Sequence, residues 1–328
     1  MLTQIEKALS RRQLLGGIVA GAAVNRLQTA PPGPAPALAL PPAPICVFSK
    51  QFHWTDVREM CAIAKEVGFD GIDLTVRNGG HVVPEKVERD LPKAVETIHQ
   101  SGLAIPMITA EIVDTSSPHC EAILRTAAGL GIRYYRWGWF KYDYDRDLNA
   151  QLESFKPKID ALAQMNEKYK ICAMYDTHSG LGMVGAPILD MYYLIKGLDP
   201  RYTGFSYDVG HATAEGGVSA WVDNFRIVEK YVRGIVVKDF VWARNEKGQW
   251  EHKWCTDGEG MVNWGRFFQM VRAANFAGPV QMHCKDPRLG GAQNGKKPTI
   301  SRDELKKIMA QNLAFVKGEM RKAGIVVS

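Results

Sequence analysis

The stretch 207–211 reads Tyr-Asp-Val-Gly-His and closes the apolar run 202–209. It places the carboxylate of Asp208 and the imidazole of His211 on either side of a glycine. Strands of a parallel sheet are buried on both faces, so polar side chains are tolerated mainly where the strands end. Asp208 is therefore a candidate metal ligand or proton acceptor. The structural alternative is that Asp208 caps the next helix and His211 is satisfied within a loop.

Seven other apolar segments end in the same way. Because side chains alternate along a strand, residues two apart share a face. The last polar residues of the eight segments are Lys50, Arg77, Glu111, Arg136, His178, Asp208, Lys238 and His283. The residues behind them on the same face, which would fill a barrel, include Phe48, Met107, Ser206 and Val236. So much charge in one place needs a ligand, a metal or ion pairing. A purely structural network of ion pairs is the alternative.

Imidazoles and carboxylates together favour Mn²⁺, Zn²⁺, Fe²⁺ or Co²⁺ over Mg²⁺ or Ca²⁺. The predicted metal ligands are Glu111, His178, Asp208 and His283. Lys238 is predicted to face a developing oxyanion, and Glu111 or His211 to act as the general base. The predicted substrate-binding residues are Lys50, Arg77, His81, Arg136 and Lys285. His81 and Glu215 lie on loops at the same end and could reach the substrate. The alternative for both is that they are solvated polar residues of a loop.

Strand-like and helix-like segments alternate from residue 45 onward. The predicted strands are 45–49, 71–76, 104–112, 134–137, 171–177, 204–209, 234–240 and 279–283. The predicted helices are 54–67, 84–100, 118–130, 148–169, 187–196, 218–231, 263–274 and 303–322. Eight such units predict a single-domain (β/α)8 barrel over residues 45–328. A doubly wound open sheet is the alternative, but no GxGxxG follows the first strand.

The composition is that of a globular protein, with 328 residues, 46% of them hydrophobic and 23% charged. Residues 1–39 contribute +3 of the formal net charge of +6, which leaves too little for a nucleic-acid-binding surface. The six cysteines include no CxxC pair, which excludes a zinc knuckle or a disulfide scaffold.

The N-terminal residues are typical of an export signal. Residues 10–15, Ser-Arg-Arg-Gln-Leu-Leu, resemble the twin-arginine motif and precede the apolar run 16–24 and a small-residue cleavage site at 37–39. The apolar run is shorter than the ~20 residues of a membrane span. We expect residues 1–39 to be a signal peptide, 40–44 a Pro-rich linker, and the mature protein to be periplasmic. The alternative is a disordered tail.

From residue 45 to its C-terminus the chain resembles the xylose isomerase-like TIM-barrel superfamily of sugar phosphate isomerases and epimerases, in an exported branch. The resemblance is carried by residues 80–82, 107–111, 135–138, 175–180, 207–212 and 237–240. It implies a divalent metal and proton transfer next to a sugar carbonyl. The better-known epimerases have a His ligand on strand seven and a Glu ligand on strand eight. Val236 and Lys238 stand on strand seven here, and Lys285 stands at the Glu position.

The predicted function is a metal-dependent sugar isomerase or epimerase that removes a proton next to a carbonyl and passes through an enediolate. One alternative is a lyase that cleaves a 3-keto-glycoside by β-elimination, because it shares the first step. Another is a non-catalytic periplasmic sugar-binding barrel. An endonuclease of the same fold is disfavoured by the low net charge. The predicted partner is a small carbohydrate, and homo-oligomerisation is left open.

Overall fold

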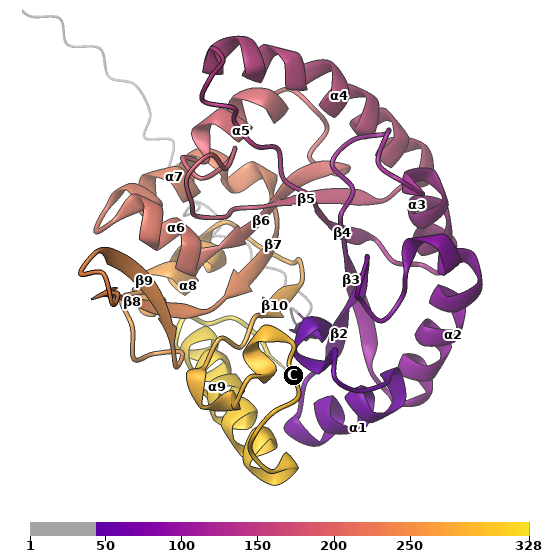
Figure 1. Ribbon diagram of the computed structural model, residues 1–328, viewed down its shortest axis with the longest axis vertical. Helices are drawn as coiled ribbons and strands as arrows, with labels where there is room; N and C mark the ends of the chain where they lie inside the picture. The colour runs from indigo at the N-terminus through magenta and orange to yellow at the C-terminus, as the bar shows by residue number, and fades with distance from the viewer. Residues whose placement is uncertain (1–43, 328) are drawn as a thin grey trace, which may run out of the picture. The chain divides into compact units, whose positions relative to one another are not determined.

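The computed structural model describes residues 44–327, so the predicted signal peptide lies outside the described part of the chain, as do residues 40–43 of the predicted linker. Eight parallel strands close into a barrel in the order β1-β10-β7-β6-β5-β4-β3-β2 (Figure 1). The strands are β1 Ile45–Phe48, β2 Gly71–Val76, β3 Ala104–Ala110, β4 Tyr134–Trp137, β5 Cys172–Asp176, β6 Thr203–Asp208, β7 Val232–Val237 and β10 Val280–Met282. The predicted (β/α)8 barrel is confirmed.

Helices connect the strands and cover the outside of the barrel (Figure 1). They are α1 Val57–Val67, α2 Val87–Gln100, α3 Cys120–Gly129, α4 Leu148–Tyr169, α5 Leu189–Ile195, α6 Val209–Gly216, α7 Ala220–Val228, α8 Trp264–Ala273 and α9 Arg302–Lys322. In α1 the Asp56 side chain accepts a hydrogen bond from the Glu59 amide, and Gly68 ends the helix at a φ of 97°. None of the helices in residues 44–327 is long and apolar enough to span a membrane.

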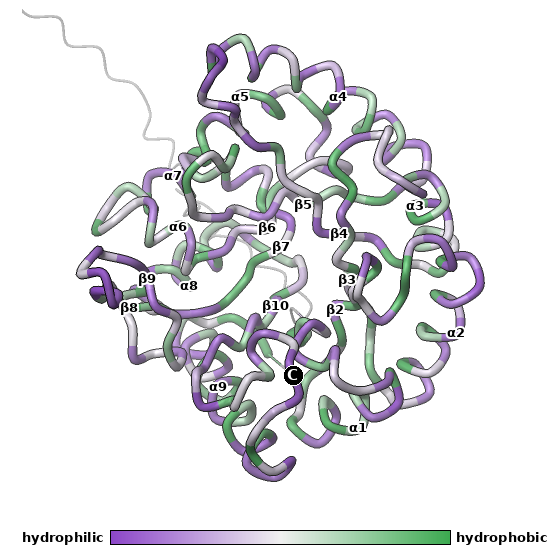
Figure 2. The backbone as a smooth tube through the Cα atoms, viewed as in Figure 1, coloured by the Kyte–Doolittle hydropathy of each residue, from purple (hydrophilic) through white to green (hydrophobic). Residues whose placement is uncertain are grey.

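Hydropathy alternates around the helices, because each buries one apolar stripe against the strands (Figure 2). Inside the barrel, a small cluster of Cys46, Met107, Cys172 and Met174 is fully enclosed. The four residues predicted to fill the barrel, Phe48, Met107, Ser206 and Val236, are all buried. A polar layer lies in the interior as well, where the Thr109 hydroxyl donates to Asp73 at 2.8 Å. The side-chain amide of Gln281 donates to the same carboxylate.

Between residues 209 and 262, one helix was not predicted and one predicted strand was too long. The predicted helix 218–231 is confirmed as α7 followed by the short 3-10 helix Glu229–Tyr231, whereas α6, which begins directly at the end of β6, was missed. The predicted strand 234–240 ends at Val237, and the chain then forms an antiparallel hairpin of β8 Asp239–Arg244 and β9 Trp250–Cys255. The hairpin was missed because its alternating polar and aromatic residues follow a strand without an intervening turn signal.

Candidate active site

A cavity of about 270 Å³ opens at the C-terminal ends of the barrel strands. Its lining residues are Phe48, Lys50, Arg77, Arg136, Trp139, Asp176, His178, His211, Lys238, His252, Trp254, His283 and Lys285. Eight residues of the predicted site are among them: Lys50, Arg77, Arg136, His178, His211, Lys238, His283 and Lys285. Barrel closure therefore brings together side chains that are far apart in the sequence, at the end of the barrel where enzymes of this architecture place their active sites.

A buried ion pair lies at the β6–β7 side of this cavity. The Lys238 ammonium is 2.7 Å from the Asp208 carboxylate, and the two side chains are only 2% and 1% exposed. The ammonium also lies 4.4 Å from the centre of the Trp254 ring. Burial raises the pKa of Asp208, while the neighbouring Lys238 cation acts to lower it. Asp208 also caps α6 by accepting from the His211 amide at 3.0 Å, so the structural alternative for this carboxylate is realised too.

Lys238 and the next residue face opposite sides, as strand alternation predicts. Asp239 points away from the cavity and accepts hydrogen bonds from the amides of Gly258, Gly260 and Val262, each at 3.1 Å. The Trp264 indole donates to it at 2.9 Å. Asp239 thus ties the segment after β9 to the start of the hairpin, and the Lys238 ammonium is left to Asp208.

A second ion pair joins β4 and β5. Arg136 lies 3.5 Å from Asp176, with side-chain exposures of 6% and 4%. The guanidinium carbon lies 4.9 Å from the centre of the Trp139 ring and 5.3 Å from that of Phe48. The buried Nε of Arg136 has no hydrogen-bond partner among the described residues. Burial raises the pKa of Asp176, and the Arg136 cation opposes this shift.

Two imidazoles lie against each other in the cavity, with their planes tilted by 36°. The ring centres of His178 and His211 are 3.9 Å apart. Nδ1 of His178 lies 2.7 Å from the Ser179 carbonyl, which can only accept, so Nδ1 carries the proton and Nε2 holds the lone pair. Nδ1 of His211 lies 2.6 Å from the Ser179 hydroxyl. Burial, with Lys238 adding to it, lowers the pKa of His178 to about 4 and that of His211 well below its usual value. Both rings are therefore neutral at pH 7.

His283 follows β10, which pairs with β7 on the edge opposite to β6. Its ring packs edge-on against Phe48 at 4.9 Å, and its buried Nε2 has no partner among the described residues. Burial lowers the pKa of His283 well below its usual value, and Lys238 contributes to the same shift. A neutral imidazole with an unpartnered nitrogen at this position can hydrogen-bond a hydroxyl group of a ligand.

Four residues singled out from the sequence lie outside the lining of the cavity: Asp208, which is buried behind Lys238, and Glu111, His81 and Glu215. The Glu111 side chain is 59% exposed and lies 3.9 Å from Arg77. His81 packs beside His53 with ring centres 5.3 Å apart. Glu215 is exposed and accepts from the Gly180 amide at 3.0 Å.

The predicted metal ligands do not converge into a metal-binding group. Within residues 44–327, no set of three or more His, Cys, Asp or Glu side chains is arranged to hold a metal ion. Asp208 is engaged by an ammonium ion, which would compete with a metal, and Glu111 is 59% exposed and outside the lining of the cavity. The residues present therefore do not fit a divalent metal. The physical reason is that Lys238 already supplies the positive charge next to Asp208.

Sequence reasoning missed three aromatic residues of the site. Trp139 follows β4, while His252 and Trp254 come from the hairpin. The Trp254 ring packs perpendicular to His211, with centres 4.8 Å apart. The alternation Trp250, His252, Trp254 places these side chains on one face of β9. That alternation was the available signal, but only the tertiary structure shows that the face turns to the cavity.

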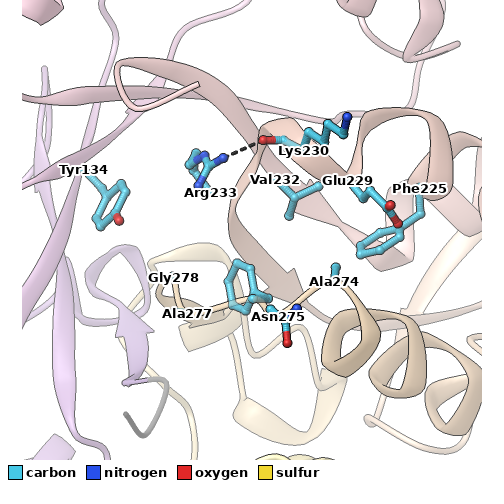
Figure 3. A pocket seen from close by; sticks show the side chains of 11 residues that line it. Tyr134, Phe225, Glu229, Lys230, Val232, Arg233, Ala274, Asn275, Ala277 and Gly278 are labelled. Carbon is cyan, nitrogen blue, oxygen red and sulfur yellow. Dashed lines mark hydrogen bonds between the residues drawn. The ribbon is translucent and has the colours of Figure 1, made fainter. Parts of the chain in front are cut away.

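A second cavity of about 190 Å³ lies at the other end of the barrel. Figure 3 shows its lining, which includes Tyr134 at the start of β4, Arg233 near the start of β7, and the loop residues Asn275 and Gly278. The Arg233 side chain donates a hydrogen bond to the carbonyl of Lys230 (Figure 3). Residues at the N-terminal ends of barrel strands usually serve stability, so the cavity at the C-terminal ends is the candidate active site.

Known proteins with a similar fold were found among solved structures. No curated protein is a significant match to the chain. Among solved structures, it resembles D-psicose 3-epimerase with D-tagatose from Clostridium cellulolyticum H10, at 11% identity and a TM-score of 0.62 over 84% of this chain and 99% of that one. It also resembles 3-keto-D-glucoside 4-epimerase from E. coli, at 13% identity and a TM-score of 0.60 over 84% and 99%.

A third similar structure is a xylose isomerase-like TIM barrel protein from Mycobacterium smegmatis in complex with magnesium, at 16% identity and a TM-score of 0.58 over 83% and 98% of the two chains. Identities this low concern the fold alone. At the level of sequence, residues 61–311 match the family described as xylose isomerase-like TIM barrel. Because that match covers most of the chain, the protein belongs to the xylose isomerase-like TIM barrel family.

Proposed function

We propose that the protein is a sugar isomerase or epimerase that removes a proton from the carbon next to a carbonyl group. The observation that carries the proposal is the placement of a buried ammonium, Lys238, beside a neutral imidazole, His211, in one cavity. Such a reaction needs a base for the proton and a positive charge for the oxygen that becomes negative. Two of the solved structures it resembles are named as sugar epimerases, which supports the assignment.

His211 is the proposed base. Asp208 holds its backbone amide, and the Ser179 hydroxyl holds Nδ1 of the ring, so both the backbone and the ring orientation are constrained. When Nδ1 donates to that hydroxyl, Nε2 holds the lone pair that accepts the proton. Glu111 was the other predicted base, but its exposed side chain lies outside the cavity. After removal of the proton, the imidazolium can return it to the neighbouring carbon, which gives the isomer when a proton also moves from one oxygen of the enediol to the other. Epimerisation instead requires a proton delivered to the same carbon from the opposite face.

Lys238 is the proposed partner of the enediolate oxygen. Its positive charge contributes to the low pKa of His211 in the free protein. When a negative oxygen forms beside the ammonium, that repulsion is offset, and His211 becomes a better base as the reaction proceeds. The charge needed for oxyanion stabilisation thus comes from the chain itself. No step is assigned to a metal, because the donor side chains do not fit one.

Exchange of the substrate proton with solvent tests the proposal. The protein is incubated in D₂O with a panel of aldoses, ketoses and 3-keto-glycosides, and deuterium incorporation is followed by NMR and mass spectrometry. We expect deuterium at the carbon next to the carbonyl, and its loss in His211→Gln. Elimination of an aglycone after exchange would identify the lyase alternative. Tight binding of a sugar without exchange would identify a sugar-binding protein and overturn the enzymatic proposal.

We also propose that the protein acts in the periplasm. The support is the order of paired arginines, apolar run and cleavage site in residues 10–39, which lie outside the described part of the chain.

A further inference from the structure

We propose that the substrate carries a permanent negative charge, a carboxylate or a phosphate, which binds between Lys50, Arg77 and Lys285. This inference rests on the proposed function and names the substrate class for the same cavity. It is argued from the balance of charge among the lining residues, from the strands that supply the three cations, and from the hydrogen bonds that these cations lack.

The charge of the cavity is unbalanced. Its lining includes five cationic side chains, Lys50, Arg77, Arg136, Lys238 and Lys285. Two carboxylates face them, and each is already in an ion pair: Asp176 with Arg136, and Asp208 with Lys238. The imidazoles add no charge at pH 7, since burial lowers their pKa values. Of the other three cations, Arg77 is partly offset by the buried Asp73 and the exposed Glu111, and the charges of Lys50 and Lys285 remain without an ion pair.

These three cations lie together on the β10–β1–β2 side of the cavity, where Lys285 is next to the Lys238–Asp208 pair because β10 pairs with β7, and Lys50 and Arg77 follow the next two strands. Strand β1 is paired with β10 on one side and with β2 on the other. Lys50 follows β1, Arg77 follows β2 and Lys285 follows β10, so the three side chains leave three adjacent strands. Lys238 and Asp208 belong to the β7 and β6 region. A ligand that spans the cavity can place an anionic end near the cations and its carbonyl near Lys238.

The contacts of the three cations within residues 44–327 are few. The Lys50 ammonium makes no hydrogen bond or ion pair there, and no carboxylate lies within ion-pair distance of Lys285. Lys285 reaches only the Gln293 carbonyl at 3.3 Å and the Asn294 side chain at 3.4 Å. Arg77 has Glu111, but at 3.9 Å and with a 59% exposed carboxylate, a pair that contributes little.

Holding these like charges together is unfavourable in the free protein. Burial lowers the pKa of Lys50, and Arg77, Arg136 and Lys238 lower it further. The pKa of Lys285 falls to about 8 through burial, with Lys238 and Lys50 contributing. An anion bound between them would remove this repulsion and accept hydrogen bonds from donors that now lack partners. A neutral sugar could offer only the hydrogen bonds. The cavity therefore suits an anionic sugar.

Calorimetric titration of the protein with three matched probes tests the inference. D-glucose, D-glucuronate and D-glucose 6-phosphate share a ring and differ at one end in charge. We expect at least one anionic probe to bind about 100-fold more tightly than glucose at low salt, and the preference to shrink as salt is added. The comparison of glucuronate with glucose 6-phosphate separates a carboxylate site from a phosphate site. Equal affinity for all three probes would overturn the inference.

Variants show whether the named cations are responsible. Lys50→Met and Lys285→Met should each weaken binding of the anionic probe about tenfold and weaken binding of glucose by much less, because glucose loses only a hydrogen bond. Lys285→Arg should keep most of the affinity, which guards against a general loss of folding. Lys93→Met, on the exposed face of α2, is the matched control and should change nothing. Undiminished binding of the anion by both Met variants would also overturn the inference.

Solvent exchange separates this inference from the proposed function. Selective binding of an anionic sugar without exchange of its proton would sustain the inference and reject the isomerase. Exchange of the proton in neutral sugars, with no preference for anionic ones, would support the isomerase and reject the inference of an anionic substrate. Lys50 and Lys285 are proposed to bind the substrate and not to move protons, so in their Met variants KM should rise more than kcat falls.

Discussion

At the level of single residues, Lys238 has two separable roles. It stabilises Asp208, which would otherwise be a buried and unpaired carboxylate, and it is proposed to stabilise the enediolate. Loss of one partner of a buried pair costs about 3–5 kcal/mol of folding free energy. Loss of an oxyanion partner lowers kcat by about 10²–10³. A single substitution therefore changes both quantities, and a second substitution is needed to tell them apart.

The first prediction uses that second substitution. Lys238→Met should lower both the melting temperature and kcat, with little change in KM. Asp208→Asn in the same chain removes the orphaned charge but keeps an oxygen to cap α6, so the double variant should recover most of the stability and remain inactive. Melting curves and turnover are measured side by side. Recovery of activity together with stability would show that Lys238 has only a structural role.

The second prediction concerns Ser179 as a positioning residue. Its hydroxyl contacts Nδ1 of His211, whereas its backbone carbonyl contacts His178. Ser179→Ala removes only the first contact, so we expect kcat to fall by roughly tenfold with KM nearly unchanged. The acidic limb of the pH profile of kcat/KM should also move, because that limb reports the free imidazole. Ser179→Thr, which keeps a hydroxyl, should restore both kcat and the pH profile. An unaltered pH profile in Ser179→Ala would show that a residue other than His211 is the base.

At the level of elements, strand alternation places a carboxylate inside the barrel as well as at its mouth. Asp73 of β2 is fully buried, and this burial raises its pKa to about 6, although hydrogen bonds from Thr109 and Gln281 and the charge of Arg136 act in the opposite direction. The folded protein therefore binds a proton between about pH 4 and 6 that the unfolded chain has released. The stability from this group is present below that range and is lost as the pH rises through about 6.

The third prediction follows from that sign. Asp73→Asn is neutral at every pH and can still accept from Thr109, so the variant should be more stable than the parent at pH 8. The advantage should shrink as the pH falls below about 6, where Asp73 becomes neutral in the folded protein. Denaturant unfolding at pH 8 and pH 5 measures both differences. A variant that is less stable at pH 8 would show that the attraction of Arg136 outweighs the cost of burial.

The β8–β9 hairpin is the element that distinguishes this site from a bare barrel mouth. It brings His252 and Trp254 to the cavity, and the Trp254 ring lies against both Lys238 and His211. An aromatic ring there excludes water from the ammonium and offers it a partially negative face. Asp239 anchors the hairpin by four hydrogen bonds from the segment 258–264. The hairpin thus links the rigid barrel to the proposed chemistry.

At the level of the whole molecule, the fourth prediction concerns metal. Because the described donor residues do not form a metal site, dialysis against EDTA should change neither the melting temperature nor the rate of solvent exchange. Elemental analysis before and after dialysis is the control for metal carried through purification. Loss of exchange that Mn²⁺ or Zn²⁺ restores would contradict this prediction and return the role of electrophile to a metal ion.

The fifth prediction concerns export. Arg11→Lys with Arg12→Lys keeps the charge but removes the twin-arginine motif, so the protein should accumulate uncleaved in the cytoplasm of a host that has this export route. Cell fractionation and the mass of the recovered chain measure the outcome. Lys7→Arg is the matched control, since it alters a basic residue outside the motif. Periplasmic recovery of the double variant would show that another signal directs the protein.

The sequence by itself determined the architecture and the end of the barrel where the site lies. The 45–49 and 71–76 runs, the helical stripes between them and six further repeats of the pattern were enough, because hydrophobic periodicity reflects local geometry. The same local rule, that side chains alternate along a strand, correctly directed Lys238 into the barrel mouth and Asp239 away from it. Eight residues of the predicted site line the cavity for this reason.

Only the tertiary structure decided which of these groups pair with one another. Ion pairing depends on distances between strands far apart in the sequence, and no periodic pattern encodes them. The barrel places Asp176 against Arg136 and leaves Lys285 without a carboxylate within ion-pair distance. The expected metal ligands do not form a metal-binding group, because Asp208 lies against Lys238 and the exposed Glu111 is outside the lining of the cavity. The chemistry of the site follows from these pairings, which exist only once the barrel has closed.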